Sequence, residues 1–386
     1  MTEQAKVPAI RFAGFTDPWE QRKLGDIASF SKGSGYSKAD IRESGIPLFL
    51  YGRMYTQYET RVDSVDTFAA PRPGTLYSKG TEIVVPASGE SAEDIARASA
   101  ITREGIALGG DLNVVYPQRM VTPLFLAYGL SHGSSQKLLA QKAQGKTVVH
   151  IHASDLKGLG IAFPDVTEQQ AIGTFFSSLD DLITLHQRKY DKLVVFKKSM
   201  LEKMFPKDGE SVPEIRFAGF TDPWEQRKFS DIVDVCSGKD YKHLEEGPIP
   251  VYGTGGFMTS VDEALSYDRD AVGIGRKGTI DKPYLLKAPF WTVDTLFYAI
   301  PKSDMDLEFV HCSFLNVDWK SKDESTGLPS LSKEAINETI ALVPSFNEQS
   351  RLGEFFSDLD SLITLHQRKL ELLRNIKKSL LDKMFV

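Results

Sequence analysis

The sequence contains little cysteine and no long apolar run. Cys236 and Cys312 are its two cysteines in 386 residues, and their spacing matches no metal-binding motif. No apolar stretch approaches the roughly 18 residues that a membrane span requires, and the first residues lack the apolar core of a signal peptide. We therefore expect a folded cytoplasmic protein with free, buried thiols.

The sequence also lacks the common motifs of catalytic sites. It has no Walker A loop, no G-x-S-x-G elbow, no H-E-x-x-H helix and no paired C-x-x-C. The string GIGRKG at 273–278 satisfies G-x-G-x-x-G, but strand-like segments flank it and no βαβ unit follows, so a dinucleotide site is disfavoured. His150, His152 and Asp155 offer no fourth metal ligand, which disfavours a metal there. We expect neither a catalytic residue nor a metal nor a cofactor in this chain.

An excess of positive charge is absent too, since the formal net charge is −6. Residues 24–162 carry 14 basic and 13 acidic side chains, whereas residues 229–342 carry 11 basic and 19 acidic ones. Within the acidic stretch, residues 269–287 hold five basic and two acidic side chains. A chain of this composition can bind a polyanion only through local patches or with the help of a basic partner.

Two long strings occur twice. RFAGFTDPWEQRK stands at 11–23 and again at 216–228, and residues 168–205 match residues 348–385, with LITLHQRK identical in both copies. The regions between these strings differ in length and content. With 41% hydrophobic residues and 23 Phe, each region can bury its own core. The repeats therefore predict two different domains carried by two copies of one frame.

The shorter repeat predicts a helical turn that docks each domain. Asp17 can cap this turn, Pro18 suits its first position and Glu20 can complete a capping box, and the second copy repeats the pattern. Trp19 and Trp224 are expected to anchor each domain to the long helices by packing, with ligand stacking as the alternative.

The longer repeat predicts a helix with an apolar seam in steps of four and three residues. The first half of residues 168–205 is acidic and the second half basic, and the other copy has the same bias, so antiparallel pairing brings opposite charges together. His186 and His366 occupy equivalent seam positions and are interpreted as register-setting residues, with a shared metal as the alternative. The remaining seam positions of the two copies are Ile172, Phe176, Leu179, Ile183, Tyr190, Leu193, Lys197, Met200 and Met204, and Leu352, Phe356, Leu359, Ile363, Leu370, Leu373, Lys377, Leu380 and Met384.

The order of these motifs resembles the specificity subunit of type I restriction-modification systems. The resemblance rests on the two G-F-x-D-x-W-E strings, on FPDVTEQQAI and VPSFNEQSRL, and on GRKGTI and PFWTVDTLFY. We predict an α+β fold in which two globular target-recognition domains are separated by two long helices that form an antiparallel intramolecular coiled coil with pseudo-twofold symmetry. The expected domains are 1–162 with docking motif 10–23, helix 163–205, 206–342 with docking motif 215–228, and helix 343–386.

The resemblance implies a non-catalytic subunit whose two domains each read one half of a bipartite DNA target. The helices would set the gap and recruit methyltransferase subunits, two being expected, together with restriction subunits. S-adenosylmethionine would bind the methyltransferase partner, because this chain lacks an N-P-P-F/Y string and contains only DKPY and TDPW. The alternatives are a self-contained DNA methyltransferase and a protein-binding scaffold, the latter favoured by the acidic second domain.

Polar loop residues are the candidates for contacting DNA, because base edges are read by such side chains. In the first domain they are Arg53, Tyr55, Gln57, Ser88, Glu90 and Arg97, and in the second they are Tyr252, Thr254, Arg276, Lys277, Thr279 and Lys282. For Arg276 and Lys277 we expect a turn that approaches a phosphate or a base edge.

Overall fold

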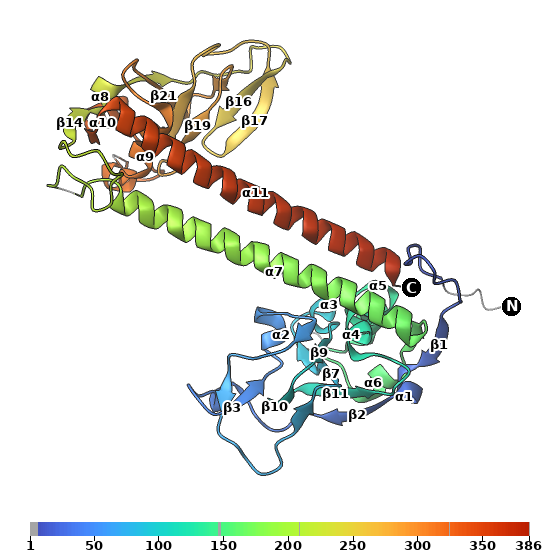
Figure 1. Ribbon diagram of the computed structural model, residues 1–386. Coiled ribbons are helices and arrows are strands. Elements are labelled where there is room, and N and C mark those ends of the chain that lie inside the picture. The colour runs from blue at the N-terminus through green and yellow to red at the C-terminus, as the bar shows by residue number, and fades with distance from the viewer. Residues whose placement is uncertain (1–6, 146–147, 208, 324, 386) are drawn as a thin grey trace. The chain divides into compact units, whose positions relative to one another are not determined.

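The computed structural model describes residues 7–145, 148–207, 209–323 and 325–385. The chain divides into two compact units, one formed by residues 1–186 and 369–386 and the other by residues 187–368. The helices α7 (Val166–Lys203) and α11 (Phe346–Met384) each contribute to both units (Figure 1).

Unit 1 is built on two mixed sheets. The larger has the order β2-β11-β7-β9-β4 and the smaller the order β5-β3-β10-β6. Its strands are β1 (Glu20–Lys23), β2 (Ala28–Lys32), β3 (Ile46–Phe49), β4 (Arg61–Val62), β5 (Phe68–Ala69), β6 (Tyr77–Lys79), β7 (Ile83–Pro86), β8 (Ser88–Gly89), β9 (Ser99–Ile101), β10 (Glu104–Leu108), β11 (Leu112–Pro117), β12 (Val149–His150) and β13 (Gly160–Phe163). Its shorter helices are α1 (Leu24–Ile27), η1 (Lys38–Asp40), α2 (Arg53–Thr56), α3 (Ala92–Ile95), α4 (Pro123–Ser131), α5 (Gly133–Lys142) and α6 (Ala153–Lys157).

The core of unit 1 lies between the larger sheet, α4 and the long helices. Val85 and Val115 of the sheet, Phe125 of α4, Phe176 of α7 and Phe385 after α11 all belong to one buried cluster. The helices α4 and α5 are separate because His132 between them is extended and Gly133 has a φ of 67°.

Unit 2 has a smaller set of sheets. One has the order β15-β21-β18-β19, and the other the order β17-β16-β20. Its strands are β14 (Glu225–Lys228), β15 (Val233–Ser237), β16 (Ile249–Gly253), β17 (Gly256–Val261), β18 (Ala271–Gly275), β19 (Tyr284–Leu286), β20 (Trp291–Thr292), β21 (Leu296–Pro301) and β22 (Ile340–Val343). Its shorter helices are α8 (Phe229–Ile232), α9 (Leu307–Leu315), η2 (Trp319–Lys322) and α10 (Lys333–Glu338).

The repeated docking motif ends in a strand and contains no helix, so the prediction of a helical turn is wrong. β1 pairs antiparallel with β13, and β14 pairs in the same way with β22. Glu20 receives a hydrogen bond from Arg22 and does not complete a capping box. Because each strand forms a four-residue ladder with a partner far along the chain, backbone pairing outweighs the local capping signal.

The two long helices run antiparallel within each unit, as their charge pattern predicts. In unit 1, Lys377 of α11 pairs with Asp180 of α7, while Phe385 packs against Phe176. In unit 2, Lys197 pairs with Asp360 at 2.6 Å, and Phe205 packs against Phe356. The seam lysines therefore have a role that the apolar period alone could not predict, because each bonds an aspartate of the opposite helix.

The seam residues are buried or half-buried along both helices. Ile172, Phe176, Leu352 and Phe356 are buried, and His186 and His366 are half-buried at their expected seam positions. Among the described residues, no group of three or more His, Cys, Asp or Glu could hold a metal ion.

The state of the two cysteines and the character of the helices can be compared with the sequence expectations. Cys312 is buried and Cys236 half-buried, and both are free thiols. No helix in the described part of the chain is both long and apolar enough to cross a membrane.

Candidate nucleic-acid interface

The two copies of the frame hold their domains through equivalent contacts. Trp19 packs edge-on against Phe125 of α4 and against Phe385, which follows α11. Trp224 packs edge-on against Phe309 of α9 and against Phe205, which follows α7, so the anchoring role of the tryptophans is confirmed. The backbone N–H of Ile10 donates to Lys383 O at 3.1 Å, and that of Ile215 donates to Lys203 O at 2.9 Å. Each docking segment is therefore tied to the end of a long helix.

Two buried ion pairs extend this frame. Arg11 donates through Nε and Nη2 to Glu168 at 2.8 and 2.6 Å, and Arg216 forms the same bidentate pair with Glu348. The hydrogen bonds that Arg11 donates to Glu168 raise the pKa of Arg11. Both glutamates belong to the repeated P-x-x-x-E-Q string, so the repeat explains why an arginine opens the docking motif.

The glutamines of the same string hold neighbouring loops. Gln169 accepts a hydrogen bond from Thr122 N at 2.8 Å and donates to Pro164 O at 2.8 Å. Gln349 makes the corresponding contacts with Asp306 N and Pro344 O. The two arginines, two glutamates and two glutamines of these contacts were missed as single sites in the sequence, although their repetition was visible there.

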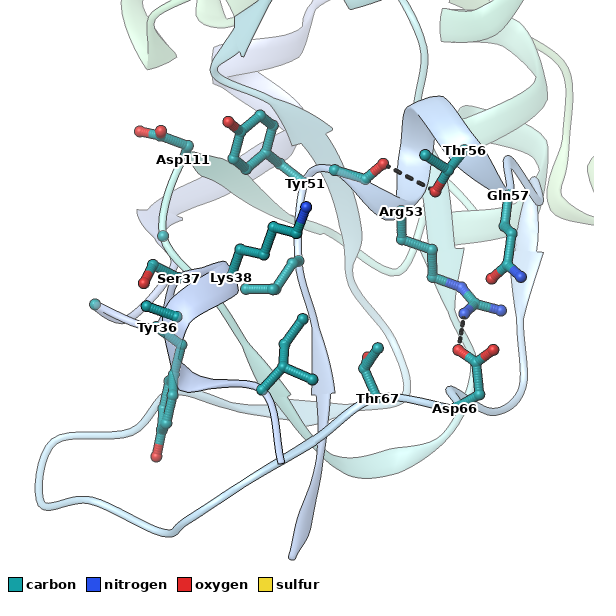
Figure 2. A pocket seen from close by; sticks show the side chains of 16 residues that line it. Tyr36, Ser37, Lys38, Tyr51, Arg53, Thr56, Gln57, Asp66, Thr67 and Asp111 are labelled. Carbon is teal, nitrogen blue, oxygen red and sulfur yellow. Dashed lines mark hydrogen bonds and ion pairs between the residues drawn. The ribbon is translucent and has the colours of Figure 1, made fainter. Parts of the chain in front are cut away.

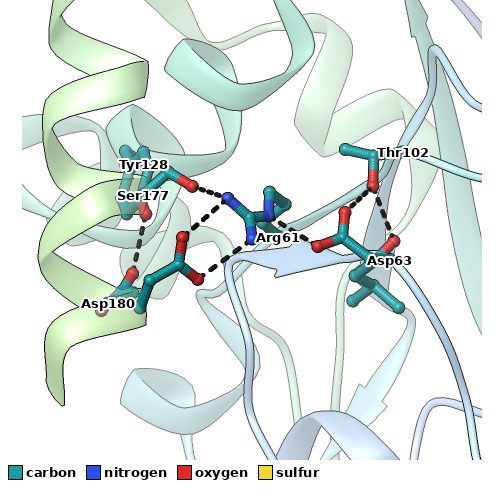
Figure 3. A network of polar contacts seen from close by, with 8 residues as sticks. Arg61, Asp63, Thr102, Tyr128, Ser177 and Asp180 are labelled. Carbon is teal, nitrogen blue, oxygen red and sulfur yellow. Dashed lines mark hydrogen bonds and ion pairs between the residues drawn. The ribbon is translucent and has the colours of Figure 1, made fainter. Parts of the chain in front are cut away.

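A polar network fixes the first domain on α7 (Figure 3). Arg61 of β4 pairs with Asp181 of α7 at 3.0 Å, donates to Ser177, and pairs with Asp63 at 2.8 Å. Tyr128 of α4 donates to Asp180 at 2.7 Å. Sheet and helix are thus joined by charge-assisted bonds, which set the orientation of the domain within unit 1.

Among the first-domain candidates, Arg53 and Gln57 line a half-open cavity of about 900 Å³ (Figure 2). Tyr36, Tyr51, Ile41 and Leu50 also line it, so much of its wall is aromatic or apolar, and Lys38 adds one charged side chain. The guanidinium of Arg53 is bonded to Asp66 and lies 3.0 Å from a carboxylate oxygen of Glu59. Arg53 is therefore neutralised within the domain, whereas the amide of Gln57 is exposed.

A second group forms around Arg97. Its guanidinium lies 5.3 Å from the ring centres of both Tyr55 and Tyr58, and it donates to Met54 O and to Asp94. Tyr55 donates to Ser88 O at 2.7 Å, and burial raises the pKa of Tyr55 to about 12. Tyr55, Ser88 and Arg97 thus lie together, and their donors are largely engaged in holding the loop.

The histidine pair borders this second group. The rings of His150 and His152 are stacked with their centres 6.4 Å apart, and His150 Nδ1 lies 3.3 Å from Ser88 Oγ. Asp155 accepts a hydrogen bond from the backbone N–H of His152, so it caps α6. Glu90, the remaining candidate of the first domain, is exposed.

In the second domain, Arg276 and Lys277 line a polar pocket of about 340 Å³ together with Lys333. The guanidinium of Arg276 lies 5.8 Å from the ring centre of Phe297, and both basic residues of the turn are exposed. The dinucleotide alternative for this turn is wrong, because β19 follows it and pairs antiparallel with β18. Lys333 was missed because it lies far from the turn in sequence and belongs to no motif.

The other second-domain candidates lie on separate segments. Tyr252 lies on β16 and Thr254 in the turn that follows, and Phe257 and Met258 of β17 are exposed. Tyr284 donates to Gly253 O at 2.7 Å, and its ring centre lies 6.3 Å from that of Tyr252. Thr279 is half-buried in the turn after Lys277, and Lys282 is exposed.

Comparisons with known proteins agree on one family. The family model for the type I restriction modification DNA specificity domain matches residues 16–194 and 221–375. A type I restriction enzyme specificity subunit, MjaVIII, from Methanocaldococcus jannaschii is 22% identical, and the match covers 95% of this chain and 92% of that protein. A putative type I specificity subunit from Mycoplasma genitalium is 26% identical, with 68% of this chain and 70% of that protein covered.

A solved structure has the same fold. The crystal structure of the type I restriction-modification system S subunit from M. genitalium superposes with a TM-score of 0.72 at 21% identity, covering 99% of both chains. The predicted α+β class, with two domains and two long packed helices, is confirmed.

Proposed function

The chain belongs to the type I restriction modification DNA specificity family, and from this we propose that its two domains read the two halves of a divided DNA sequence. The subunit is a non-catalytic DNA specificity subunit, as the matched family and its relatives indicate. The observation that carries the proposal is that two unlike domains are held by two copies of one set of contacts. A repeated frame around different readers suits a target with two different halves.

We further propose that α7 and α11 act as the spacer between the half-sites. The seam and the lysine–aspartate pairs make each half of the helix pair a stiff element. A stiff element keeps the number of base pairs between the half-sites constant, whereas a flexible linker would permit several gaps.

The same helices offer two equivalent surfaces to methyltransferase subunits. In unit 1, Leu182, Leu185 and Ile376 are between 39% and 47% exposed. The equivalent residues of unit 2, Leu362, Leu365 and Phe196, are exposed to 44% or 45%. Exposed apolar stripes mark interaction sites, and two like stripes suit two copies of one partner. Restriction subunits would join the same complex, and S-adenosylmethionine would bind the methyltransferase partner.

Selection from random duplexes tests this proposal. The complex of the full chain with its methyltransferase partner should enrich a motif of two short blocks separated by an unspecified stretch of constant length. Enrichment of no motif would favour the protein-binding scaffold, and binding of S-adenosylmethionine by the isolated chain would favour a self-contained methyltransferase.

A further inference from the structure

The pocket at the end of β18 brings three basic side chains of the second domain together. It is lined by the basic and hydroxyl side chains of Ser237, Arg276, Lys277, Ser330, Ser332 and Lys333. Within the described part of the chain, no carboxylate forms an ion pair with Arg276, Lys277 or Lys333, although Glu334 also lines the pocket.

Several other basic residues of this domain are neutralised by neighbouring carboxylates. Arg227 pairs with Asp304, Lys287 with Asp270 and Lys320 with Asp281, each at 2.8 or 2.9 Å. In a domain with more acidic than basic side chains, three cations that have no ion pair among the described residues repel one another around one pocket unless an anion joins them. The arrangement therefore points to an anionic ligand.

The backbone holds this pocket in place without that ligand. Arg276 N donates to Thr295 O at 2.8 Å, and Leu331 N donates to Arg276 O at 2.9 Å. Asp323 accepts hydrogen bonds from the backbone N–H groups of Ser325 and Ser330, which lower the pKa of its carboxyl group. The turn that carries Arg276 is therefore hydrogen-bonded to the loop that carries Ser330 and Leu331. Because this backbone is held in place, the basic side chains are preorganised, which reduces the entropy lost on binding.

In the first domain, the segments equivalent to the turn and loop of this pocket also carry hydrogen-bond donors. There, Ser88 is opposite His150 in the β8–β12 ladder, as Lys277 is opposite Ser330 in unit 2. His152 directly precedes α6, as Ser332 directly precedes α10. Two unlike domains thus place polar donors at the same point of the common frame.

We propose that the pocket formed by Arg276, Lys277 and Lys333 binds one backbone phosphate of the DNA duplex. The inference rests on the proposed function, and it assigns these three residues to contact a phosphate and not a base edge. The three cations and the hydroxyls of Ser237 and Ser330 supply donors in several directions, which fits the phosphate oxygens. A base edge instead presents donors and acceptors in one plane. Lys333 is the contact that the sequence motif did not include.

The test compares the Lys333→Gln variant with the wild-type chain, each in complex with the methyltransferase partner. Loss of one phosphate contact should weaken binding about tenfold near 0.1 M salt, equally on the selected sequence and on random duplex, and should reduce the salt slope by about one. Lys277→Gln should act in the same way. An unchanged salt slope, or a loss confined to the selected sequence, would overturn the proposal.

Lys287→Gln is the matched control, because it removes one positive charge from the same domain. Lys287 follows Leu286, which pairs with Ala271 at the opposite end of β18 from Arg276. This variant should leave the salt slope unchanged. An equal reduction in the control would show that only net charge matters and would contradict a defined site.

Duplexes with single neutral methylphosphonates locate the contact. At one position the neutral group should weaken the wild-type complex but not the Lys333→Gln complex, whereas equal weakening of both at every position would contradict the proposal. If the wild-type complex prefers no sequence, the proposed function fails, but random duplex still tests the phosphate contact.

Discussion

At the scale of single residues, the frame depends on two buried ion pairs. The side chain of Glu168 is fully buried and that of Arg11 is 10% exposed. A buried carboxylate that loses its partner keeps the cost of desolvation without the compensating bonds. The pair is therefore expected to be sensitive to removal of either partner.

Arg11→Ala should lower the free energy of unfolding by about 3 kcal/mol or more, because it leaves Glu168 buried and unpaired. Urea unfolding followed by circular dichroism measures this change. Arg22→Ala is the control, since the Arg22–Glu20 pair is about half exposed and should contribute less than about 1 kcal/mol. Equal losses in the two variants would show that the Arg11 pair has no special role.

His132 makes unit 1 sensitive to acid. Burial, together with the nearby positive charge of Lys377, lowers the pKa of His132 to about 4. A histidine with a lowered folded pKa stabilises the fold while it is neutral, above the unfolded value near 6.5. That stability is lost as the pH falls from about 6.5 to about 4.

His132→Gln should remove part of this acid sensitivity. The unfolding free energy of the wild type is expected to fall by about 3 kcal/mol from this group across that window, and the variant should show a smaller slope. Unfolding curves between pH 4 and pH 7 measure both slopes. Burial also lowers the pKa of His311, so some acid sensitivity should remain in the variant.

Sequence patterns predicted part of the candidate interface at this scale. Arg276 and Lys277 were predicted from a glycine-rich turn, and they do line one pocket. Lys333 joins them only through the pairing of Lys277 with Ser330, which no local pattern contains. The internal neutralisation of Arg53 and Arg97 was equally invisible, because it depends on the folded positions of Asp66 and Asp94.

At the scale of elements, the long helices were predictable and the docking strands were not. The helices carry their period and their charge bias within one continuous segment, so the sequence specifies both the seam and the antiparallel direction. β1 and β14 depend on partner strands far along the chain. Local capping residues predicted a helical turn there because the competing ladder is nonlocal.

The seam pair Lys197–Asp360 tests the antiparallel register. Reversing one charge, in Lys197→Asp or Asp360→Lys, should destabilise unit 2 by placing like charges together. The double reversal should recover about 1 kcal/mol, measured as the coupling energy of a double-mutant cycle. A coupling energy near zero would contradict the pairing of these two residues.

At the scale of the whole molecule, the proposed spacer role depends on helix length. One extra heptad after Arg188 in α7 and after Arg368 in α11 adds about 10.5 Å to each helix. The equivalent positions keep the seam in phase, since seven residues complete one repeat. The gap between the half-sites should then lengthen by up to about three base pairs, while the two half-site sequences stay the same.

Selection from random duplexes with the lengthened chain measures this change. An altered half-site sequence would show that the helices contribute to base reading. An unchanged gap would show that the partner subunits, and not α7 and α11, set the spacing.

Genome-wide mapping of methylated bases, with and without the gene for this chain, tests the central claim most directly. The account predicts that methylation dependent on this chain falls on one motif of two short blocks separated by a gap of constant length. Chain-dependent methylation of a continuous motif, or methylation that is the same without the chain, would contradict it.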